Sequence, residues 1–269
     1  MLPEKAASLA VPALDPESTI REVTGFIKTK VETTGAKGVV VGLSGGVDSS
    51  LVAALCVRAL GPERVLGVLM PTSFTPPQDM EDAKTLAEQL GIRTRRVDIQ
   101  RISEAFFDEL GCKRGEERFR KPMANIRARC RMVVLYYFAN LECLLVAGTG
   151  DRSETLIGYF TKYGDGGADI QPIAHLYKTQ VRQLAEQLGV PKRIAYKPSS
   201  PQLYPGHKAT DELPLSYEQL DPVLFGLFDK GLTPVEVSRL SGVPVHVVEH
   251  VLKMSENSRH KREPPPKVK

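Results

Sequence analysis

The chain has 269 residues, of which 42% are hydrophobic and 25% are charged, and its formal net charge at pH 7 is +4. A chain of this length and composition can bury a core large enough to fold without a disulfide bridge or a structural metal. The small positive charge does not by itself indicate nucleic-acid binding, although it is compatible with a polyanionic small molecule as ligand.

The cysteines and the two ends of the chain bear on its location. The four cysteines, which show neither metal-ligand spacing nor a Cys-x-x-Cys pair, are Cys56, Cys112, Cys130 and Cys143. We therefore expect all four to be reduced thiols of a cytoplasmic protein. No segment has the pattern of a secretory signal or of a membrane-spanning helix, so we expect no membrane contact. We expect a flexible extension over residues 1–14, one domain over 15–263 and a flexible tail over 264–269.

Helical patterns and apolar runs alternate along this domain. An amphipathic helix starts at Asp15 and Pro16, and its apolar face recurs at helical spacing at Ile20, Val23, Ile27 and Val31. The patterns then predict strands over 38–43, 65–70, 94–99 and 143–147, and helices over 51–60, 76–90, 102–110 and 122–141. Residues 111–121 are charged and contain glycine, which predicts a mobile loop. The alternation is typical of an α/β fold with a doubly wound, mostly parallel sheet, helices on both faces and a helical C-terminal tail.

Residues 42–50, Gly-Leu-Ser-Gly-Gly-Val-Asp-Ser-Ser, join the first predicted strand to the helix after it. Adjacent glycines let the backbone approach an anion, and the helix N-terminus points free N–H groups at it, which predicts a phosphate-binding loop. No lysine follows the glycines, so this is not a Walker A loop, and the spacing does not fit Gly-x-Gly-x-x-Gly. Phosphates would repel the Asp48 carboxylate unless a cation lay between them, so we predict that Asp48 is a magnesium ligand. The alternative is that Asp48 only stabilises the N-terminus of the helix by its negative charge.

A second polar cluster follows the fourth predicted strand, where the ligands of open α/β sheets gather. It runs through residues 149–154 and 158–170 and ends at 176–179. Charged residues and glycines at this density cannot form a core. A solvated surface loop is the alternative, but the interleaved aromatic residues Tyr159, Phe160 and Tyr163 favour a packed site.

Five motifs together indicate a family. Ser-Gly-Gly-x-Asp-Ser resembles the loop of the N-type ATP pyrophosphatases, which have an adenine nucleotide alpha-hydrolase-like fold and cleave ATP between its α and β phosphates. An Arg-x-Arg-Met helix, Gly-Thr followed by Ser-Glu, Phe-Thr-Lys-Tyr-Gly-Asp-Gly-Gly and a terminal His-Lys-Arg follow in order. Over residues 18–266 the chain therefore resembles the ammonia-dependent NAD synthetases.

The resemblance implies a ligase that carries out the last step of NAD biosynthesis. The nicotinate carboxylate of deamido-NAD is adenylated by ATP with release of pyrophosphate, and ammonia then displaces AMP to give NAD. Free ammonia is the expected nitrogen donor because the region before the phosphate loop is too short for a glutaminase domain; a separate glutaminase partner stays open. The resemblance also implies Mg²⁺ as cofactor and a homodimer, in which the apolar residues of the long helix would pack on a second subunit.

The resemblance assigns roles to individual residues. Asp48 and Lys178 would be catalytic, with Lys178 neutralising charge on the departing pyrophosphate, and Asp48 and Glu154 would hold the metal. ATP would contact Gly42, Leu43, Ser44, Gly45, Gly46, Val47, Asp48, Ser49, Thr149, Lys178 and Ser200. Deamido-NAD would contact Arg129, Lys162, Asp169, His260 and Lys261.

The chain departs from the family pattern at two places. Asp151 and Arg152 stand where many relatives have asparagine and lysine, a polar exchange that leaves Thr149 and Glu154 in place. Pro201 follows the hydroxyl pair Ser199 and Ser200, so either serine could meet the nucleotide.

Other readings of the sequence remain. A different enzyme of the pyrophosphatase superfamily could adenylate another carboxylate or a tRNA base, but no basic patch or catalytic cysteine pair favours this. Residues 233–254 resemble a helix-turn-helix, which would fit a non-catalytic, nucleotide-sensing DNA-binding regulator. The second helix, however, has few polar side chains that could contact DNA bases. His246 and His250 match a zinc-protease pattern that has no cleft chemistry beside it. We therefore expect no nucleic-acid partner.

Overall fold

Four parallel strands form the central sheet. In the computed structural model, which describes residues 9–268, the strands lie in the order β3-β2-β1-β4 and are β1 (Gly38–Gly42), β2 (Val65–Leu69), β3 (Arg93–Arg96) and β4 (Leu144–Val146). The register aligns Val40 with Leu66 on one side and with Val146 on the other. The predicted parallel sheet is confirmed. Residues 1–8 of the expected N-terminal extension and Lys269 of the expected tail lie outside the described residues.

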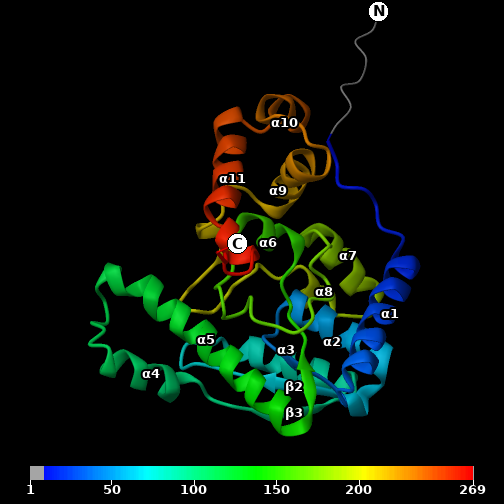
Figure 1. Ribbon diagram of the computed structural model, residues 1–269, viewed down its shortest axis with the longest axis vertical. Helices are drawn as coiled ribbons and strands as arrows, with labels where there is room; N and C mark the ends of the chain where they lie inside the picture. The colour runs from blue at the N-terminus through cyan, green and yellow to red at the C-terminus, as the bar shows by residue number, and fades with distance from the viewer. Residues whose placement is uncertain (1–8, 269) are drawn as a thin grey trace, which may run out of the picture.

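Helices cover both faces of this sheet (Figure 1). Successive side chains of a strand point to opposite faces, so Val39 and Val41 pack into one layer and Val40 into the other. The first layer contains α1 (Pro16–Thr34), α2 (Val47–Leu60), α3 (Pro77–Gln89), α7 (Lys178–Gln187) and α8 (Lys192–Ala195). The second contains α5 (Glu117–Glu142), on which α4 (Gln100–Glu109) packs. The doubly wound α/β fold is confirmed.

The C-terminal helices build a second core beyond one end of the sheet (Figure 1). Its buried residues come mainly from the region after the sheet, which contains α6 (Arg152–Ile157), α9 (Tyr217–Leu224), α10 (Pro234–Ser241), α11 (Val245–Asn257) and α12 (Arg259–Arg262). Leu9 and Val11, from the segment expected to be a flexible extension, pack against this helical core.

The strand order creates a crevice between β1 and β4. After β1 the chain runs through α2 to β2 and β3 on one side, and it then crosses by α5 to β4 on the other side. The connections to the two sides of β1 lie on opposite faces, so the loops after Gly42 and Val146 diverge. Ligands of open α/β sheets bind at this topological switch point. Both polar clusters found in the sequence follow these two strands.

Two predicted boundaries are wrong. The long helix begins at Glu117 rather than at 122, which shortens the predicted loop of residues 111–121 to 111–116. Pro122 lies inside this helix, because the one backbone hydrogen bond it removes falls near an exposed end where water can replace it. Strand β3 ends at Arg96, and its four side chains are exposed. A charged edge strand of this kind discourages pairing with other strands.

The described residues contain neither a helix that could span a membrane nor a disulfide bridge. No helix within residues 9–268 has the length and apolar character needed to cross a membrane. The cysteines are all free thiols, and Cys56 and Cys130 are buried. Burial raises the pKa of Cys56 to about 12, so this thiol stays protonated and unreactive near neutral pH.

Candidate active site

The glycine loop after β1 has the geometry of an anion cradle. Gly45 has φ +77°, and a Cβ on it would lie 2.2 Å from the carbonyl oxygen of Asp79, so only glycine fits there. The hydroxyls of Ser44 and Ser49 lie 3.1 Å apart, and the Gly46 N–H donates to Ser44 Oγ at 3.2 Å. Helix α2 begins at Val47, and the N–H groups of its first turn have no partners within the helix.

A fully buried lysine gathers three carboxylates beside this loop. Lys178 Nζ lies 2.7 Å from Asp48 Oδ1, 2.7 Å from Asp151 Oδ2 and 2.9 Å from Glu154 Oε1. Asp48 is in the first turn of α2, Lys178 starts α7, and Asp151 caps α6 by accepting from the Glu154 N–H at 2.8 Å. Three helix N-termini therefore converge on one ammonium group.

The cluster carries more negative than positive charge when all its groups are ionised. Burial, together with the neighbouring carboxylates, raises the pKa of Asp151 and of Glu154 above its ordinary value. Burial alone would lower the pKa of Lys178, but the three carboxylates outweigh it and hold that pKa well above its usual range. An additional cation at this position would relieve the repulsion among the acids.

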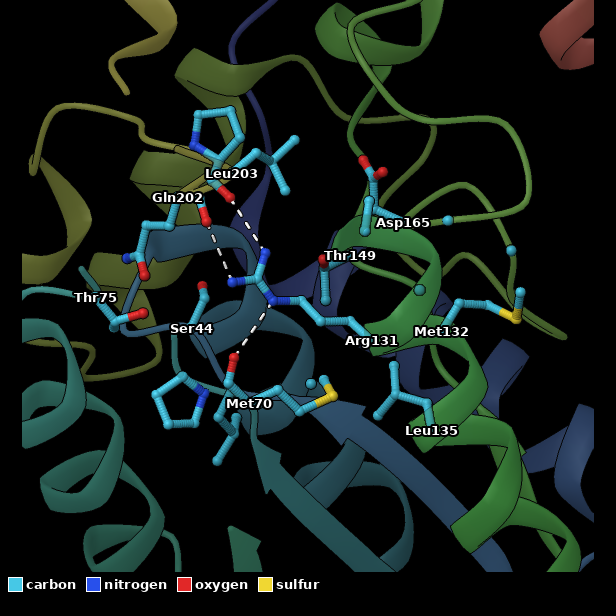
Figure 2. Close-up of a pocket in the computed structure, with 18 of the residues that line it drawn as sticks. Ser44, Met70, Thr75, Arg131, Met132, Leu135, Thr149, Asp165, Gln202 and Leu203 are labelled. Atoms are coloured by element: carbon cyan, nitrogen blue, oxygen red, sulfur yellow. Dashed lines mark hydrogen bonds between the residues drawn. The ribbon is translucent and has the colours of Figure 1, made fainter. Parts of the chain in front are cut away.

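Three adjoining pockets form one cleft along the carboxyl end of the sheet, and Ser44 and Asp165 line all three. The first is largely apolar; Figure 2 shows Met70, Met132 and Leu135 at one end and the Arg131 guanidinium near the centre. The second lies over the glycine loop, and the third extends toward the C-terminal helices. Asp48 and Glu154 line both of these, so the charged cluster sits at their junction.

The C-terminal segment closes the third pocket. Lys261 Nζ donates to the carbonyl oxygens of Gly158 at 2.7 Å and Phe160 at 2.8 Å. Arg262 donates to the last carbonyls of α6, those of Thr155 at 3.1 Å and Leu156 at 2.9 Å. These contacts satisfy acceptors at a helix end and hold the tail against the cleft.

With this geometry in place, comparison with known proteins decides the family. Residues 19–265 match the sequence profile of NAD synthase. The chain belongs to the NAD synthase family. It is 55% identical over 254 residues to the NH(3)-dependent NAD(+) synthetase of Hyperthermus butylicus, covering 94% of this chain and 91% of that protein. It is 51% identical over 255 residues to the enzyme of the same name from Pyrobaculum aerophilum, covering 95% and 93%.

Solved structures agree with this assignment. The NH3-dependent NAD synthetase of Campylobacter jejuni, in complex with the nitrate ion, superposes with a TM-score of 0.80 at 30% identity, covering 96% of this chain and all (100%) of that one. The NMN synthetase of Francisella tularensis gives a TM-score of 0.82 at 31% identity, covering 95% and 99%. The predicted family and the predicted class of enzyme, a ligase of NAD biosynthesis that uses ATP, are confirmed.

The residues predicted to contact ATP line the cleft of this NAD synthase, except Lys178, which is fully buried behind Asp48 and Glu154. Thr149 lines the first and third pockets. Ser200 lines the first and second, whereas Ser199 lines only the second, so Ser200 is the better placed of the two serines. The Ser200 hydroxyl donates to the carbonyl oxygen of His207, which fixes its direction.

The residues predicted to contact deamido-NAD fall into three sets. Lys261 lines the third pocket. Outside the three pockets, Arg129 donates to the Lys162 carbonyl at 3.2 Å, and Lys162 Nζ donates to the His260 carbonyl at 2.6 Å. Asp169 is separate, because its carboxylate accepts from the Tyr136 hydroxyl at 3.0 Å and from the Val146 N–H at 2.8 Å.

Several cleft residues escaped the sequence analysis. The sequence assigns Asp151 only a polar exchange, although its place at the start of a helix after a buried strand indicates a cap that faces the site. Asp165 lies within the Phe-Thr-Lys-Tyr-Gly-Asp-Gly-Gly motif, which gives it no role. Arg131 donates to the backbone carbonyls of Met70 at 3.4 Å and Gln202 at 3.2 Å, contacts between distant segments that no local pattern reveals.

The two motifs considered as alternatives lie in the helical core. Val248 and Val251 of α11 are buried there, whereas His246 and His250 are exposed. Among residues 9–268 no group of three or more His, Cys, Asp or Glu side chains is arranged to hold a metal ion. Helix α12, which follows α11, brings Lys261 to the cleft.

Substitution of Gly158 tests the docking of the C-terminal segment. Gly158 has φ +70°, and a Cβ there would lie 2.1 Å from Ser258 Cβ. Gly231 has φ +64° with open space around its Cβ position, so Gly231→Ala measures the backbone cost alone. We expect Gly158→Ala to lower the free energy of unfolding by about 1–3 kcal/mol more than Gly231→Ala, because the added methyl group overpacks the contact. Equal losses in denaturant unfolding would show that the contact is not tight.

Proposed function

We propose that this protein makes NAD by the ATP-dependent amidation of deamido-NAD with ammonia, through an adenylated nicotinate carboxylate. The observation that carries the proposal is the single cleft in which the glycine loop, the Lys178 cluster and the C-terminal Lys261 meet. The relatives, which match over nearly their whole length, are named as NH(3)-dependent NAD(+) synthetases, which supports the same activity. The proposed reaction uses the glycine loop, the Lys178 cluster and Lys261 together.

The two chemical steps place distinct demands on the cleft. First, a carboxylate oxygen of deamido-NAD bonds to the α-phosphorus of ATP, and the bond to the bridging oxygen of pyrophosphate breaks. Ammonia then bonds to the acyl carbon, loses a proton and expels AMP. We assign the binding of pyrophosphate to the N–H groups of the loop and the first turn of α2, where preorganised donors meet developing negative charge.

The residues present fit a magnesium ion. Among the described residues, no hydrogen bond uses Asp48 Oδ2 or Glu154 Oε2, and the buried Asp151 Oδ2 is paired only with Lys178 Nζ. Asp48 and Glu154 would hold the ion, and oxygen atoms of ATP would complete its coordination. When bound, the ion would neutralise charge on the phosphates. The three N–H groups of Lys178 all face carboxylates, and sharing of Asp48 and Glu154 with the ion would leave Lys178 free to donate to pyrophosphate.

For deamido-NAD we propose a cationic surface that begins at Lys261 in the third pocket and continues outside the pockets to Arg129 and Lys162. These three residues supply positive charge suited to the dinucleotide pyrophosphate or the nicotinate carboxylate. His260 and Asp169 are proposed to contact the same substrate. Free ammonia is the proposed nitrogen donor. We propose that the reaction takes place in the cytoplasm, which the free cysteines support.

We also propose a homodimer that pairs through α5. Val133, Tyr137 and Leu141 recur at four-residue spacing on this helix, and each is at least 60% exposed. Such a stripe is costly to leave in water, and a second copy of the same helix would cover it.

The dimer is tested by Tyr137→Glu. We expect the variant to elute as a monomer in size-exclusion chromatography with light scattering, because a charge would be buried at the interface. Val235→Glu on α10 is the matched control, since Val235 is also exposed, at 68%, but lies on the helical core. A Tyr137→Glu variant that keeps the wild-type mass would remove α5 as the interface.

The proposed activity is tested with purified protein, deamido-NAD, ATP, magnesium and ammonium. We expect NAD, AMP and pyrophosphate to form in equal amounts. The corresponding mononucleotide acid is the competing substrate, because one solved relative is an NMN synthetase. Nucleotide binding without NAD formation under any nitrogen donor would overturn the substrate assignment, and other carboxylates and tRNA would then be screened.

A further inference from the structure

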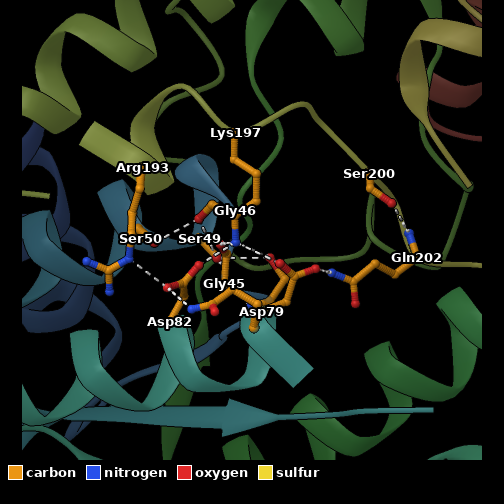
Figure 3. A network of polar contacts seen from close by, with 12 residues as sticks. Gly45, Gly46, Ser49, Ser50, Asp79, Asp82, Arg193, Lys197, Ser200 and Gln202 are labelled. Carbon is orange, nitrogen blue, oxygen red and sulfur yellow. Dashed lines mark hydrogen bonds and ion pairs between the residues drawn. The ribbon is translucent and has the colours of Figure 1, made fainter. Parts of the chain in front are cut away.

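A second lysine network contacts the glycine loop at Gly45. Lys197 Nζ is 2.7 Å from Asp79 Oδ1 and 2.5 Å from Asp82 Oδ2, and both acids belong to α3. The same Nζ donates to the carbonyl oxygen of Gly45 at 3.1 Å. Figure 3 shows the Lys197 side chain reaching from its own segment to the loop and the two acids. The ammonium group has three N–H donors, and these three contacts engage all of them.

The contact with Gly45 fixes the direction of a peptide group. In a trans peptide the carbonyl of one residue and the N–H of the next point in opposite directions. The Gly45 carbonyl faces Lys197, so the Gly46 N–H faces the opposite side, where it donates to Ser44 Oγ at 3.2 Å. Ser44 lines all three pockets. Lys197 thus keeps the Gly45 carbonyl turned away from Ser44 and the Gly46 N–H turned toward Ser44, which lines the space proposed for phosphate.

The same network ties the loop to the segment that covers the cleft. Asp79 accepts from Lys197 on Oδ1 and from Gln202 Nε2 at 2.5 Å on Oδ2. Gln202 lines the first and second pockets and lies two residues from Ser200. Both ends of residues 197–202 are therefore fastened to one carboxylate in the first turn of α3, and that residue's backbone lies against Gly45.

Arg193 belongs to the same network as Lys197 but forms no hydrogen bond to the glycine loop within residues 9–268. Its Nε lies 3.1 Å from Asp82 Oδ1, so it shares an acid with Lys197. Arg193 makes no hydrogen bond to the glycine loop among the described residues, and its side chain is 56% exposed. Lys197 therefore differs from Arg193 in that it contacts Gly45 and Asp79.

We propose that Lys197 is a positioning residue for the phosphate site: it sets the Gly45–Gly46 peptide in the orientation that receives pyrophosphate and couples this loop to residues 198–202. The inference rests on the proposed function, because it assumes that the loop binds the pyrophosphate portion of ATP. Lys197 lines the second pocket, but Asp79, Asp82 and the Gly45 carbonyl engage all three of its N–H donors, so we assign its effect to the backbone of the loop.

The test compares the binding of two probes to wild type and Lys197→Met by isothermal titration calorimetry. Pyrophosphate with magnesium reports on the loop, and AMP reports on the nucleoside part of the cleft. We expect Lys197→Met to weaken pyrophosphate binding at least tenfold and AMP binding less than threefold. Arg193→Met is the matched control and should change both affinities less than twofold. In turnover, Lys197→Met should raise the KM for ATP and leave the KM for ammonia unchanged.

Each other result has a defined meaning. Unchanged pyrophosphate binding in Lys197→Met, with binding intact in wild type, overturns the positioning role and leaves the proposed function standing. Equal weakening of both probes assigns Lys197 a general structural role and also overturns the inference. Absence of pyrophosphate binding in wild type overturns the proposed function itself. Should Lys197→Met not fold, the double variant Lys197→Met/Asp79→Asn removes one uncompensated carboxylate and is titrated in the same way.

Discussion

Replacement of Asp48 by asparagine is expected to lower NAD formation by about 10²–10³-fold while the protein stays folded. Asparagine has nearly the same shape but no charge, so it withdraws one of the two carboxylates proposed to hold magnesium. A bound metal contributes several kcal/mol to stabilising charge in the transition state, and each 1.36 kcal/mol corresponds to about tenfold in rate. The measurement is kcat/KM for ATP at saturating deamido-NAD and ammonium.

The matched control for this variant is Asp108→Asn. Asp108 also pairs with a cation, Arg114 at 2.9 Å, but this ion pair is at the surface of α4. Surface pairs contribute little, so we expect activity within twofold of wild type. An Asp48→Asn enzyme that kept more than a tenth of wild-type activity would contradict the proposed role of Asp48.

Replacement of Lys178 by methionine is expected to be the most destabilising single change in the cleft. It leaves Asp48, Asp151 and Glu154 together without their counter-ion, and Asp151 is fully buried. Removing one partner of a buried ion pair costs about 3–5 kcal/mol. Lys192→Met is the control, because Lys192 is 78% exposed and its surface pair with Glu186 contributes at most about 1 kcal/mol. Urea unfolding of both variants measures the difference.

The pH dependence of Lys178→Met gives a second readout. Without Lys178, the pKa values of Asp151 and Glu154 in the folded state rise further above their unfolded values, because the positive charge that lowered them is gone. The folded variant then binds more protons than the unfolded chain, so its stability increases as the pH falls from 7 toward 5. If Lys178→Met lost the same free energy of unfolding at pH 5 as at pH 7, or lost none at pH 7, the electrostatic account of the cluster would be contradicted.

The sequence predicts those parts of the site that are local in the chain. The loop from Gly42 to Ser50 needs only a strand, two glycines and a helix start, all of which are adjacent, and the structure has this arrangement. The pairing of Lys178 with Asp48 spans 130 residues, and that of Lys197 with Gly45 spans 152. Such contacts depend on how helices converge over the sheet, and no periodicity within one element reveals them.

Helix geometry explains a further limit of the sequence analysis. Arg127 and Arg131 are four residues apart and share one face of α5, whereas Arg129, two residues from each, projects on the opposite side. The structure accordingly directs the first two toward the segment at 201–203 and leaves Arg129 exposed. The motif identifies the helix, but only the packing of α5 decides which arginine faces the cleft.

The most direct test of the central claim, adenylation of the nicotinate carboxylate, uses deamido-NAD labelled with ¹⁸O in that carboxylate. The enzyme is supplied with ATP, magnesium and ammonium, and the products are analysed by mass spectrometry. If a carboxylate oxygen attacks the α-phosphorus and ammonia then cleaves the acyl–oxygen bond, one ¹⁸O appears in AMP and the other stays in the amide of NAD. Label in pyrophosphate or inorganic phosphate, or unlabelled AMP beside newly formed NAD, would contradict the account.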